Sequence, residues 1–431
     1  MQVTVETGEG LARQMTVELP PEEIEQEVDK RLQEVARNAR LPGFRPGKVP
    51  MRVLRQRFGD GVRSEVFGEK VQASFPAAIA QVELRPAGMP EIDADIDKST
   101  RRYAYTAKFE VLPEIEVRGL DGKPIKRPVA EVGESDVDDM IASLREQRKT
   151  WMDVDRPAAK GDRVTISFEG TIDAEAFPGG SADDVPLELG SGRMVPGFED
   201  QLVGVAVGDE REIDVTFPGD YHGKDLAGKQ AQFKVVVKTV AEPALPDVDA
   251  EFIRGFGIED GDLERFRADV RSNMGRELKQ RIESKLKEQV MDALLEVNPI
   301  DLPAVLVAEE LKALKGQARE AVGGGTFDLP DEVFADSAKR RVALGLIVAE
   351  VVKQHGLTPD ADRVRAAVEA MAATYETPQA VIDYYYADHQ RLAAVKSVVM
   401  EQLVVERMLE QADVQDEPTT FAAITETPQA D

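Results

Sequence analysis

The residues of this chain with the clearest capacity for chemistry form one short segment, Gly43-Phe44-Arg45-Pro46-Gly47-Lys48-Val49-Pro50. Its prolines remove backbone donors and hold the preceding residues extended, and its glycines allow tight reversals. The segment therefore predicts a stiff, protruding turn rather than a helix. At its apex Phe44 offers apolar area to a partner, while Arg45 and Lys48 offer contacts to phosphate or carboxylate groups.

The charge around this loop is opposite in sign to that of the whole chain. Between Arg37 and Arg57 there is no acidic residue, although the formal net charge of the chain is −27. The basic residues of this stretch are Arg37, Arg40, Arg45, Lys48, Arg52, Arg55 and Arg57. Such a local inversion indicates a targeted electrostatic feature, and the mixture of aromatic and basic groups suits a partner of protein and nucleic acid.

The loop has two other possible interpretations. An ordinary solvated loop with chance charges is the simpler one, since charge runs are usually solvated faces. A nucleotide-binding phosphate loop fails on spacing, because G-x-x-x-G-K is one residue short and Val49 stands where a Ser or Thr would hold magnesium.

Composition limits the class of protein. At 431 residues the chain is too long for one core, so roughly three units are expected. It has no cysteine, which excludes disulfides and thiolate metal sites and fits a reducing compartment. His222, His355 and His389 lack zinc-site spacing, so neither a metal nor another cofactor is expected. No secretory signal and no run of about 18 apolar residues occur, which predicts a cytoplasmic protein without a membrane partner.

The loop belongs to an N-terminal α+β module expected over residues 1–112. Apolar residues at Ile24, Val28 and Leu32 predict an amphipathic helix that begins at Pro20-Pro21. The other elements expected are strands at 2–6, 12–19 and 102–111 and helices at 51–58 and 62–82. Residues 113–149 form an extended connector and a helix over 134–149, whose apolar stripe needs a partner to bury it.

A Gly-rich, strand-rich module is expected over residues 150–245. Its strands are predicted at 163–170, 185–189, 210–217 and 232–240, a spacing typical of a small antiparallel sheet. The prolines of Glu242-Pro243-Ala244-Leu245-Pro246 mark a linker at its end.

Long helical patterns dominate residues 246–414. Asp262 can cap a helix that runs to Asn298-Pro299. Breaks at Asp301-Leu302-Pro303, Gly323-Gly324-Gly325, Thr358-Pro359 and Thr377-Pro378 predict two helical arms, at about 302–356 and 358–413. Stripes on these helices are wider than two-helix arms can bury, so some apolar surface should stay open to unfolded segments. The tail, 415–431, has no periodicity and is expected to be disordered.

The motif G-F-R-x-G-K-x-P from Gly43 to Pro50 resembles the ribosome-docking signature of the bacterial trigger factor family, and the resemblance spans nearly the whole chain. It implies docking on the large ribosomal subunit beside the peptide exit, with Phe44, Arg45 and Lys48 touching ribosomal protein and RNA. The implied ribosome-binding residues are Gly43, Phe44, Arg45, Pro46, Gly47 and Lys48. The resemblance also implies an ATP-independent chaperone for nascent and unfolded polypeptides, a homodimer off the ribosome, and a link to cell division and the cell cycle.

Two segments of the middle module, Gly161 to Gly170 and Leu189 to Glu199, resemble the FK506-binding (FKBP) type of prolyl isomerase. That resemblance implies an antiparallel half-barrel around one helix and cis/trans isomerisation of X-Pro bonds. Carried over residue by residue, the catalytic pocket consists of Phe168, Phe177, Met194, Val195, Phe198, Tyr221 and Phe233. The backbone amide near Val195 would hold a substrate carbonyl.

Two positions depart from the isomerase pattern. Phe198 stands in place of the usual tryptophan of the pocket floor, which is a conservative change. Pro178 follows Phe177 where an acidic residue is common, which removes a carboxylate from the pocket rim and predicts modest turnover with binding retained.

The expected fold is thus a multidomain α+β protein: a ribosome-binding α+β domain, an FKBP-like half-barrel, and an all-α C-terminal domain with two arms. The alternative function is a stand-alone cytosolic prolyl isomerase that dimerises through its helical region. A structural assembly factor without catalysis is a third possibility, in which the phenylalanines only fill a core. Hydrolysis by Glu169, Asp173 and Glu175 is disfavoured, since nothing supplies a sugar site.

Overall fold

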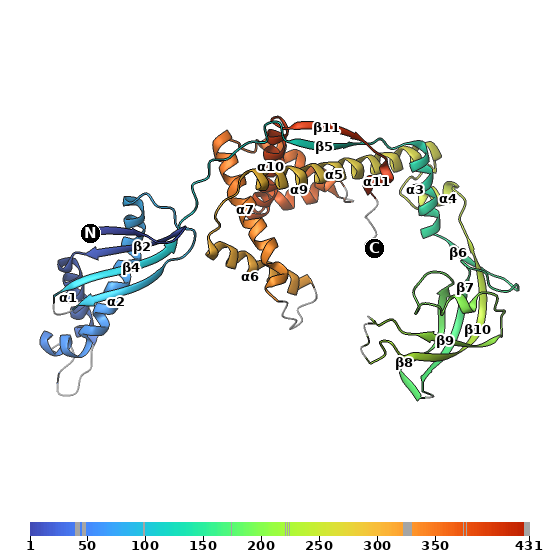
Figure 1. Cartoon of the computed structure of the whole chain (residues 1–431), viewed down its shortest axis with the longest axis horizontal. Helices are drawn as coiled ribbons and strands as arrows, with labels where there is room; N and C mark the ends of the chain where they lie inside the picture. The colour runs from blue at the N-terminus through green and yellow to red at the C-terminus, as the bar shows by residue number, and fades with distance from the viewer. Residues whose placement is uncertain are drawn as a thin grey trace. The chain divides into compact units, whose positions relative to one another are not determined.

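The computed structural model describes residues 1–38, 44, 49–97, 100–173, 175–219, 221, 223, 225–321, 330–373, 375 and 377–425. The chain divides into two compact units, each built from segments distant in sequence (Figure 1). One comprises residues 1–127 and 283–416, and the other comprises residues 128–282 and 417–431. The division falls inside the predicted helical domain, because the long helix α5 (Leu263–Val297) contributes to both units.

The N-terminal module is a four-stranded antiparallel sheet with two helices, in which the strand β3 was not predicted from the sequence. The sheet has the order β1-β2-β4-β3. Its elements are β1 (Gln2–Thr7), β2 (Ala12–Leu19), β3 (Glu91–Asp97), β4 (Arg102–Glu110), α1 (Pro21–Asn38) and α2 (Met51–Gln81). Alternate residues Met15, Val17 and Leu19 of β2 are buried, as is the α1 stripe that begins at Ile24, so the sheet and both helices share one core.

Helix α2 differs from the prediction of two helices. It runs without interruption from Met51 to Gln81, through Gly59-Asp60-Gly61. Gly59 is buried, and Asp60 pairs with Arg63 one turn later at 3.3 Å. A buried helix can retain such glycines, because tertiary packing outweighs their intrinsic cost of about 1 kcal/mol each.

The middle module is an antiparallel sheet built around one long strand, β10 (Gln230–Ala244). One edge of β10 pairs with β7 (Arg163–Ile172), and β7 pairs with β8 (Glu175–Glu188). Its other edge pairs with β9 (Glu210–Thr216) and then with β6 (Thr150–Asp153). The one helix that the FKBP resemblance implies corresponds to a single 3-10 turn, η1 (Asp200–Leu202). Alternate residues Val164 and Ile166 of β7 and Val235 and Val237 of β10 face the module's core.

Helix α3 (Glu134–Gln147) buries the stripe for which the sequence predicted a partner. Val137 and Ile141 pack against α4 (Ala250–Arg254) and the first half of α5, through residues such as Phe266 and Val270. Asp262 accepts a hydrogen bond from the N–H of Arg265 at 2.7 Å, as expected of the residue that caps α5. The connector helix is therefore part of a helical cluster rather than a free linker.

Residues 415–425 differ from the predicted disordered tail, 415–431, whose last six residues lie outside the described part of the chain. Residues Asp413–Pro418 form β11, which pairs with β5 (Pro124–Val129), and Phe421–Thr425 form the short helix α11. Phe421 and Ile424 of α11 are buried in the cluster of α3, α4 and α5. Burial of these two side chains orders a segment whose own periodicity is too short to predict a helix.

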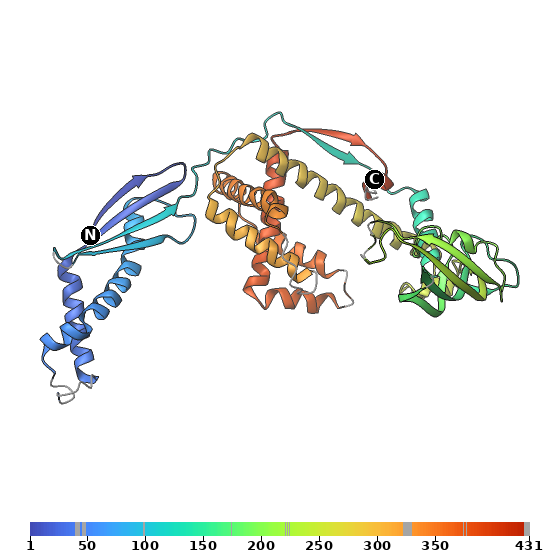
Figure 2. The same cartoon turned by 60° about the horizontal axis from the view of Figure 1, so that its bottom comes forward.

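The helices between residues 304 and 409 fall into two groups, called here the first and the second arm. The first consists of α6 (Ala304–Ala321) and α7 (Glu332–His355), which lie side by side in both views (Figures 1 and 2). The second consists of α8 (Ala361–Ala372), α9 (Pro378–Tyr386) and α10 (His389–Leu409). The predicted break at Gly323-Gly324-Gly325 lies outside the described residues. The predicted cap at Thr358-Pro359 is wrong by two residues, because the Asp360 side chain accepts from the N–H of Arg363 at 2.7 Å.

Candidate functional site

The middle module holds a cluster of aromatic rings centred on Phe233 of β10. The Phe233 ring lies 5.8 Å from that of Phe168, 6.1 Å from that of Phe177 and 5.4 Å from that of Phe198, measured between centroids. Interplanar angles of 69°, 87° and 84° make all three pairs edge-to-face. This arrangement brings the positive ring edges to the negative faces and fixes each ring's orientation.

All seven side chains that the sequence predicted for the pocket lie in this one cluster. Phe198 and Phe233 are buried, whereas Phe168, Phe177 and Tyr221 are only partly buried. Met194 and Val195 are likewise partly buried against the cluster. Phe198 and Phe233 are therefore shielded from solvent, whereas the other five side chains are partly accessible to it.

Phe217 belongs to the cluster but was missed as a site residue. Its ring lies 6.1 Å from that of Phe177 and 4.8 Å from that of Tyr221. The signal that identifies it is the alternation of β9, in which Ile213 and Val215 also point inward. Leu226, partly buried against the same cluster, had no such pattern around it.

Two glycines leave room for the rings. A Cβ at Gly170 of β7 would overlap the Phe233 ring, with the ring's Cδ1 atom 2.8 Å away, and would lie 3.0 Å from the carbonyl oxygen of Gly180. A Cβ at Gly180 of β8 would lie 2.9 Å from the Phe177 ring. Real Cβ atoms do not approach other atoms this closely, so both positions exclude larger residues while the rings stay in place.

Glu199 holds the loop that carries Met194 and Val195. Its carboxylate is buried and accepts from the backbone N–H groups of Gly190 at 2.8 Å, Gly192 at 3.0 Å and Met194 at 3.1 Å. The Ser191 hydroxyl donates to the same group at 3.2 Å. Burial works to raise the pKa of Glu199, but these donors outweigh it and hold the pKa below its usual range. The loop is thus wrapped around a carboxylate that stays charged.

The predicted docking loop is described only in part. Phe44 is 40% exposed. Gly43, Arg45, Pro46, Gly47 and Lys48 lie outside the described residues. At the base of the loop Val49 is buried in the N-terminal core, and the carbonyl of Pro50 accepts from the N–H of Val53 at 2.9 Å as α2 begins.

The basic face near this loop is partly neutralised. Arg55 of α2 forms an ion pair with Asp29 of α1 through both carboxylate oxygens. Arg52 and Arg57 are exposed on the same helix. The number of basic residues in the sequence therefore overstates the positive charge available to a partner, because the ion pair between α1 and α2 is not visible in the sequence.

The second arm exposes large apolar and aromatic side chains. Tyr375 and Tyr384 are 60% and 55% exposed, and Met371, Tyr386 and Val398 are exposed as well. The guanidinium of Arg391 lies 3.7 Å from the centre of the Tyr384 ring. A small core of Val364, Val368, Val395 and Val399 joins α8 to α10, and Ile382 and Tyr385 of α9 pack against it. The expectation that an arm leaves apolar surface open holds for this arm.

The described part of the chain contains neither a metal-binding cluster nor a membrane-spanning helix. Among those residues no group of three or more His, Cys, Asp or Glu could hold a metal ion. No helix within the described ranges is both long and apolar enough to cross a membrane.

Comparison with known proteins matches all parts of the chain. Residues 1–144 match "Bacterial trigger factor protein (TF)", residues 262–410 match its C-terminal counterpart, and residues 154–238 match "FKBP-type peptidyl-prolyl cis-trans isomerase". Trigger factor of Ectopseudomonas mendocina is 50% identical and covers 100% of both chains. Trigger factor of Thioalkalivibrio sulfidiphilus is 48% identical over 98% of this chain and 97% of its own.

A solved structure has the same fold. It comes from work on promiscuous substrate recognition in folding and assembly by the trigger factor chaperone, and it aligns with a TM-score of 0.50 at 19% identity. The alignment covers 95% of this chain and 100% of the other. Together these matches mean that the chain belongs to the bacterial trigger factor family of ribosome-associated chaperones, and that its middle module is an FKBP-type peptidyl-prolyl cis-trans isomerase domain.

Proposed function

We propose that this protein docks on the large ribosomal subunit through the loop from Gly43 to Lys48 and acts there on newly made polypeptides. The intact motif at that loop, with Phe44 exposed, is the observation that carries the proposal. With a net charge of −27, the chain as a whole is repelled by phosphate, so attraction to ribosomal RNA requires a local basic group. Arg45 and Lys48 supply it beside an apolar anchor, Phe44.

Co-sedimentation with purified bacterial 70S ribosomes tests whether this loop is the docking site. A variant with Phe44→Ala, Arg45→Ala and Lys48→Ala should no longer sediment with the ribosomes. Binding of the wild-type protein should weaken as the salt concentration rises. The matched control replaces the exposed Arg52 and Arg57 of α2 with alanine, which removes the same number of charges beside the loop. Equal binding by the triple variant, or none by the wild type, would favour a stand-alone isomerase that dimerises through its helical region.

The aromatic cluster is proposed as the isomerase site. Rotation about an X-Pro bond crosses a barrier of about 18–20 kcal/mol that comes from amide resonance, and it requires no nucleophile. Twisting the amide reduces its charge separation. A pocket floored by Phe198 and Phe233 that strips water from the carbonyl thus stabilises the twisted state over the planar one. In this scheme Phe168, Phe177, Met194 and Tyr221 form the wall around the proline.

The backbone N–H of Val195 is proposed to donate to the substrate carbonyl that precedes the proline. Glu199 fixes the loop on the N-terminal side of Val195, through Met194 and Gly192. A donor held in place costs no reorganisation when the bond twists. Pro178 provides no carboxylate at the rim next to Phe177, so turnover is expected to be modest.

A proline-limited refolding assay tests the catalytic assignment. Tyr221→Ala removes a partly buried wall side chain and should reduce catalysis of refolding several-fold, while leaving ribosome binding unchanged. An assembly factor without catalysis would give the same refolding rate with and without the wild-type protein.

The second arm is proposed as a surface for unfolded polypeptides. Its exposed tyrosines combine apolar area with a polar end, which suits weak contact with many sequences. Replacement of Tyr375, Tyr384 and Tyr386 with serine should raise the protein concentration needed to suppress aggregation of a refolding client, without changing isomerisation of a short peptide.

Off the ribosome we propose a homodimer in the cytoplasm that covers part of this apolar surface. Sedimentation equilibrium over a range of concentrations tests it. A single species of monomer mass at every concentration would refute the dimer.

A further inference from the structure

The fold brings one carboxylate back to the basic stretch around the predicted docking loop. No acidic residue lies between Arg37 and Arg57 in the sequence. Asp29 of α1 nevertheless lies against Arg55 of α2, and among the described residues it is the one acidic side chain that forms an ion pair with this stretch. Since the chain already carries a net charge of −27, a carboxylate at this position works against binding of RNA.

The contact has the geometry with which a guanidinium recognises an oxyanion. The Nη2 atom of Arg55 donates to both carboxylate oxygens of Asp29 at 2.5 Å, and its Nε atom donates to Oδ1 at 3.1 Å. A guanidinium presents the same planar fork to a carboxylate and to a phosphate. The Asp29 carboxylate therefore occupies the position in which Arg55 would bind a phosphate of RNA.

The pair lies at the protein surface, close to the loop. The side chains of Arg55 and Asp29 are 55% and 38% exposed. A rise of about 1.5 Å per residue places Arg55 only about 6 Å along the helix axis from Met51, where α2 begins. An exposed ion pair has a small net free energy, because water solvates both separated partners well. A phosphate that approaches Arg55 can therefore displace Asp29.

The nearest other carboxylate on this side of α1 is already engaged. Glu25, one turn before Asp29, accepts a hydrogen bond from the Tyr103 hydroxyl and pairs with Arg63 at 3.4 Å. Tyr103 is buried in the core of the N-terminal module, so it holds Glu25 in place. Removal of the Asp29 charge would thus leave Arg55 without a carboxylate partner among the described residues.

We propose that Asp29 competes with ribosomal RNA for Arg55, so that docking replaces the Asp29–Arg55 ion pair with a pair between Arg55 and an RNA phosphate. Asp29 then limits the affinity for the ribosome. It also lowers binding to other anions, because Arg55 is satisfied until the rest of the docked surface holds a phosphate beside it. This inference rests on the proposed docking through the loop and adds to it the residue that limits its strength.

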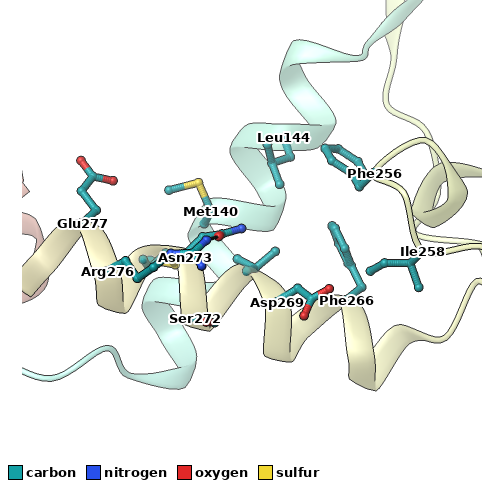
Figure 3. A pocket seen from close by; sticks show the side chains of 12 residues that line it. Met140, Leu144, Phe256, Ile258, Phe266, Asp269, Ser272, Asn273, Arg276 and Glu277 are labelled. Carbon is teal, nitrogen blue, oxygen red and sulfur yellow. Dashed lines mark hydrogen bonds between the residues drawn. The ribbon is translucent and has the colours of Figure 1, made fainter. Parts of the chain in front are cut away.

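A double-mutant cycle on ribosome binding tests the exchange of partners. The full-length wild type, Asp29→Asn, Arg55→Ala and the variant with both changes are each titrated with purified vacant 70S ribosomes. Because the sequence has no cysteine, each protein can carry Ser143→Cys with one fluorophore, and binding is followed by fluorescence anisotropy. Met140 and Leu144 of α3 face α5 (Figure 3), whereas Ser143 of the same helix is exposed, so the label does not disturb the packing of α3.

Asp29→Asn should tighten ribosome binding about fivefold, since it removes the competitor for Arg55. Arg55→Ala should weaken binding more in the Asp29→Asn background than in the wild-type background, because only the wild type must break an ion pair to use Arg55. Equal effects of Arg55→Ala in the two backgrounds would overturn the proposal, since Asp29 would then act only through its general charge. Binding by Asp29→Asn that is no tighter than that of the wild type would overturn it as well.

A salt series identifies the chemical nature of the partner of Arg55. In the Asp29→Asn background, Arg55→Ala should reduce the slope of log affinity against log salt concentration by about 0.7–0.9, the value for one phosphate contact. An unchanged slope would overturn the proposal in favour of a carboxylate on a ribosomal protein, which releases no condensed counterion.

Glu69→Gln is the matched control for the change of charge. Glu69 pairs with Arg31 across the same two helices at 2.9 Å and is 55% exposed. It lies about 27 Å from Met51 along α2, well beyond the screening length of about 8 Å at physiological salt. Its neutralisation should therefore leave ribosome affinity unchanged. Tightening equal to that of Asp29→Asn would overturn the proposal, because net charge alone would then account for the effect.

Failure of this exchange is distinguishable from failure of the proposed docking. The variant with Phe44, Arg45 and Lys48 replaced by alanine is titrated in parallel. If the wild type binds ribosomes and this variant does not, while Asp29→Asn binds like the wild type, only the role of Asp29 is wrong. If the wild type does not bind ribosomes at all, the proposed docking fails and the role of Asp29 fails with it.

Discussion

At the scale of single residues, the middle module depends on one buried carboxylate. Glu199 accepts four hydrogen bonds from the loop between Gly190 and Met194. These hydrogen bonds, rather than apolar packing, hold the glycine-rich turn in place. Buried charges are stable only when they are fully hydrogen-bonded, and this one is. Loop geometry at the proposed substrate donor, Val195, is therefore set by a side chain outside the ring cluster.

Glu199→Gln should lower the free energy of unfolding of the middle module by about 2 kcal/mol, because a neutral amide turns one NH₂ group toward backbone donors. Catalysis of a prolyl peptide should fall as well, since the loop before Val195 loses its anchor. Asp200→Asn, at the exposed neighbouring position, is the control for the charge change. Urea unfolding followed by Trp151 fluorescence measures the first effect, and unchanged stability would refute the anchoring role.

The lowered pKa of Glu199 also determines how the stabilities of the wild type and of Glu199→Gln depend on pH. A carboxylate whose folded pKa is lowered stabilises the fold above its unfolded pKa, about 4.3, and loses that contribution as the pH falls through the folded pKa. The stability difference between wild type and Glu199→Gln should be constant above about pH 6 and shrink in acid. A difference that grows in acid would contradict the assignment.

Gly170→Ala should be damaging although it adds one methyl group. The new Cβ would overlap the Phe233 ring and approach the carbonyl of Gly180 on β8, so the central ring must move. Overpacking of this kind costs about 1–3 kcal/mol, and the displaced ring should reduce isomerase activity more than ribosome binding. Gly275→Ala on α5, where an added Cβ meets nothing within 4 Å, is the control and should be neutral or stabilising. Unfolding and peptide assays on both variants give the comparison.

At the scale of elements, the sequence predicted those whose pattern is local. The spacing of Ile24, Val28 and Leu32 was sufficient for α1, and alternation was sufficient for β2 and β10. Strand β11 could not be found this way, because its stability comes from pairing with β5 and contacts such as Arg127 to Asp416, which lie 289 residues apart. The isomerase residues were identified from family motifs, and only Phe217 could have been added from periodicity alone.

Helix α11 gives a test at this scale. Phe421→Ala should lower the thermal stability of the α3–α5 cluster by an amount that corresponds to about 3 kcal/mol, because a buried ring is lost from the shared core. Ala422→Ser, at an exposed position of the same helix, should change little. Hydrogen exchange of α3 amides reports the effect locally, and equal exchange in both variants would mean that α11 does not stabilise the cluster.

At the scale of the whole molecule, the chain behaves as a set of modules with separate cores. The N-terminal module, the half-barrel, the α3–α5 cluster and the second arm each bury their own apolar residues. Chains built this way do not in general unfold in one cooperative step. The sole tryptophan, Trp151 on β6, lies 4.8 Å from the Arg163 guanidinium within the half-barrel, so its fluorescence reports on that module alone.

Urea unfolding should therefore give different transitions by two probes. Far-UV circular dichroism follows mainly the long helices α5, α7 and α10, whereas Trp151 follows the sheet. Glu199→Gln should shift the fluorescence transition to lower urea and leave the dichroism transition in place, because Glu199 touches only the half-barrel loop. Coincident shifts in both signals would mean that the modules unfold together. The stability of one core would then depend on the folding of the others.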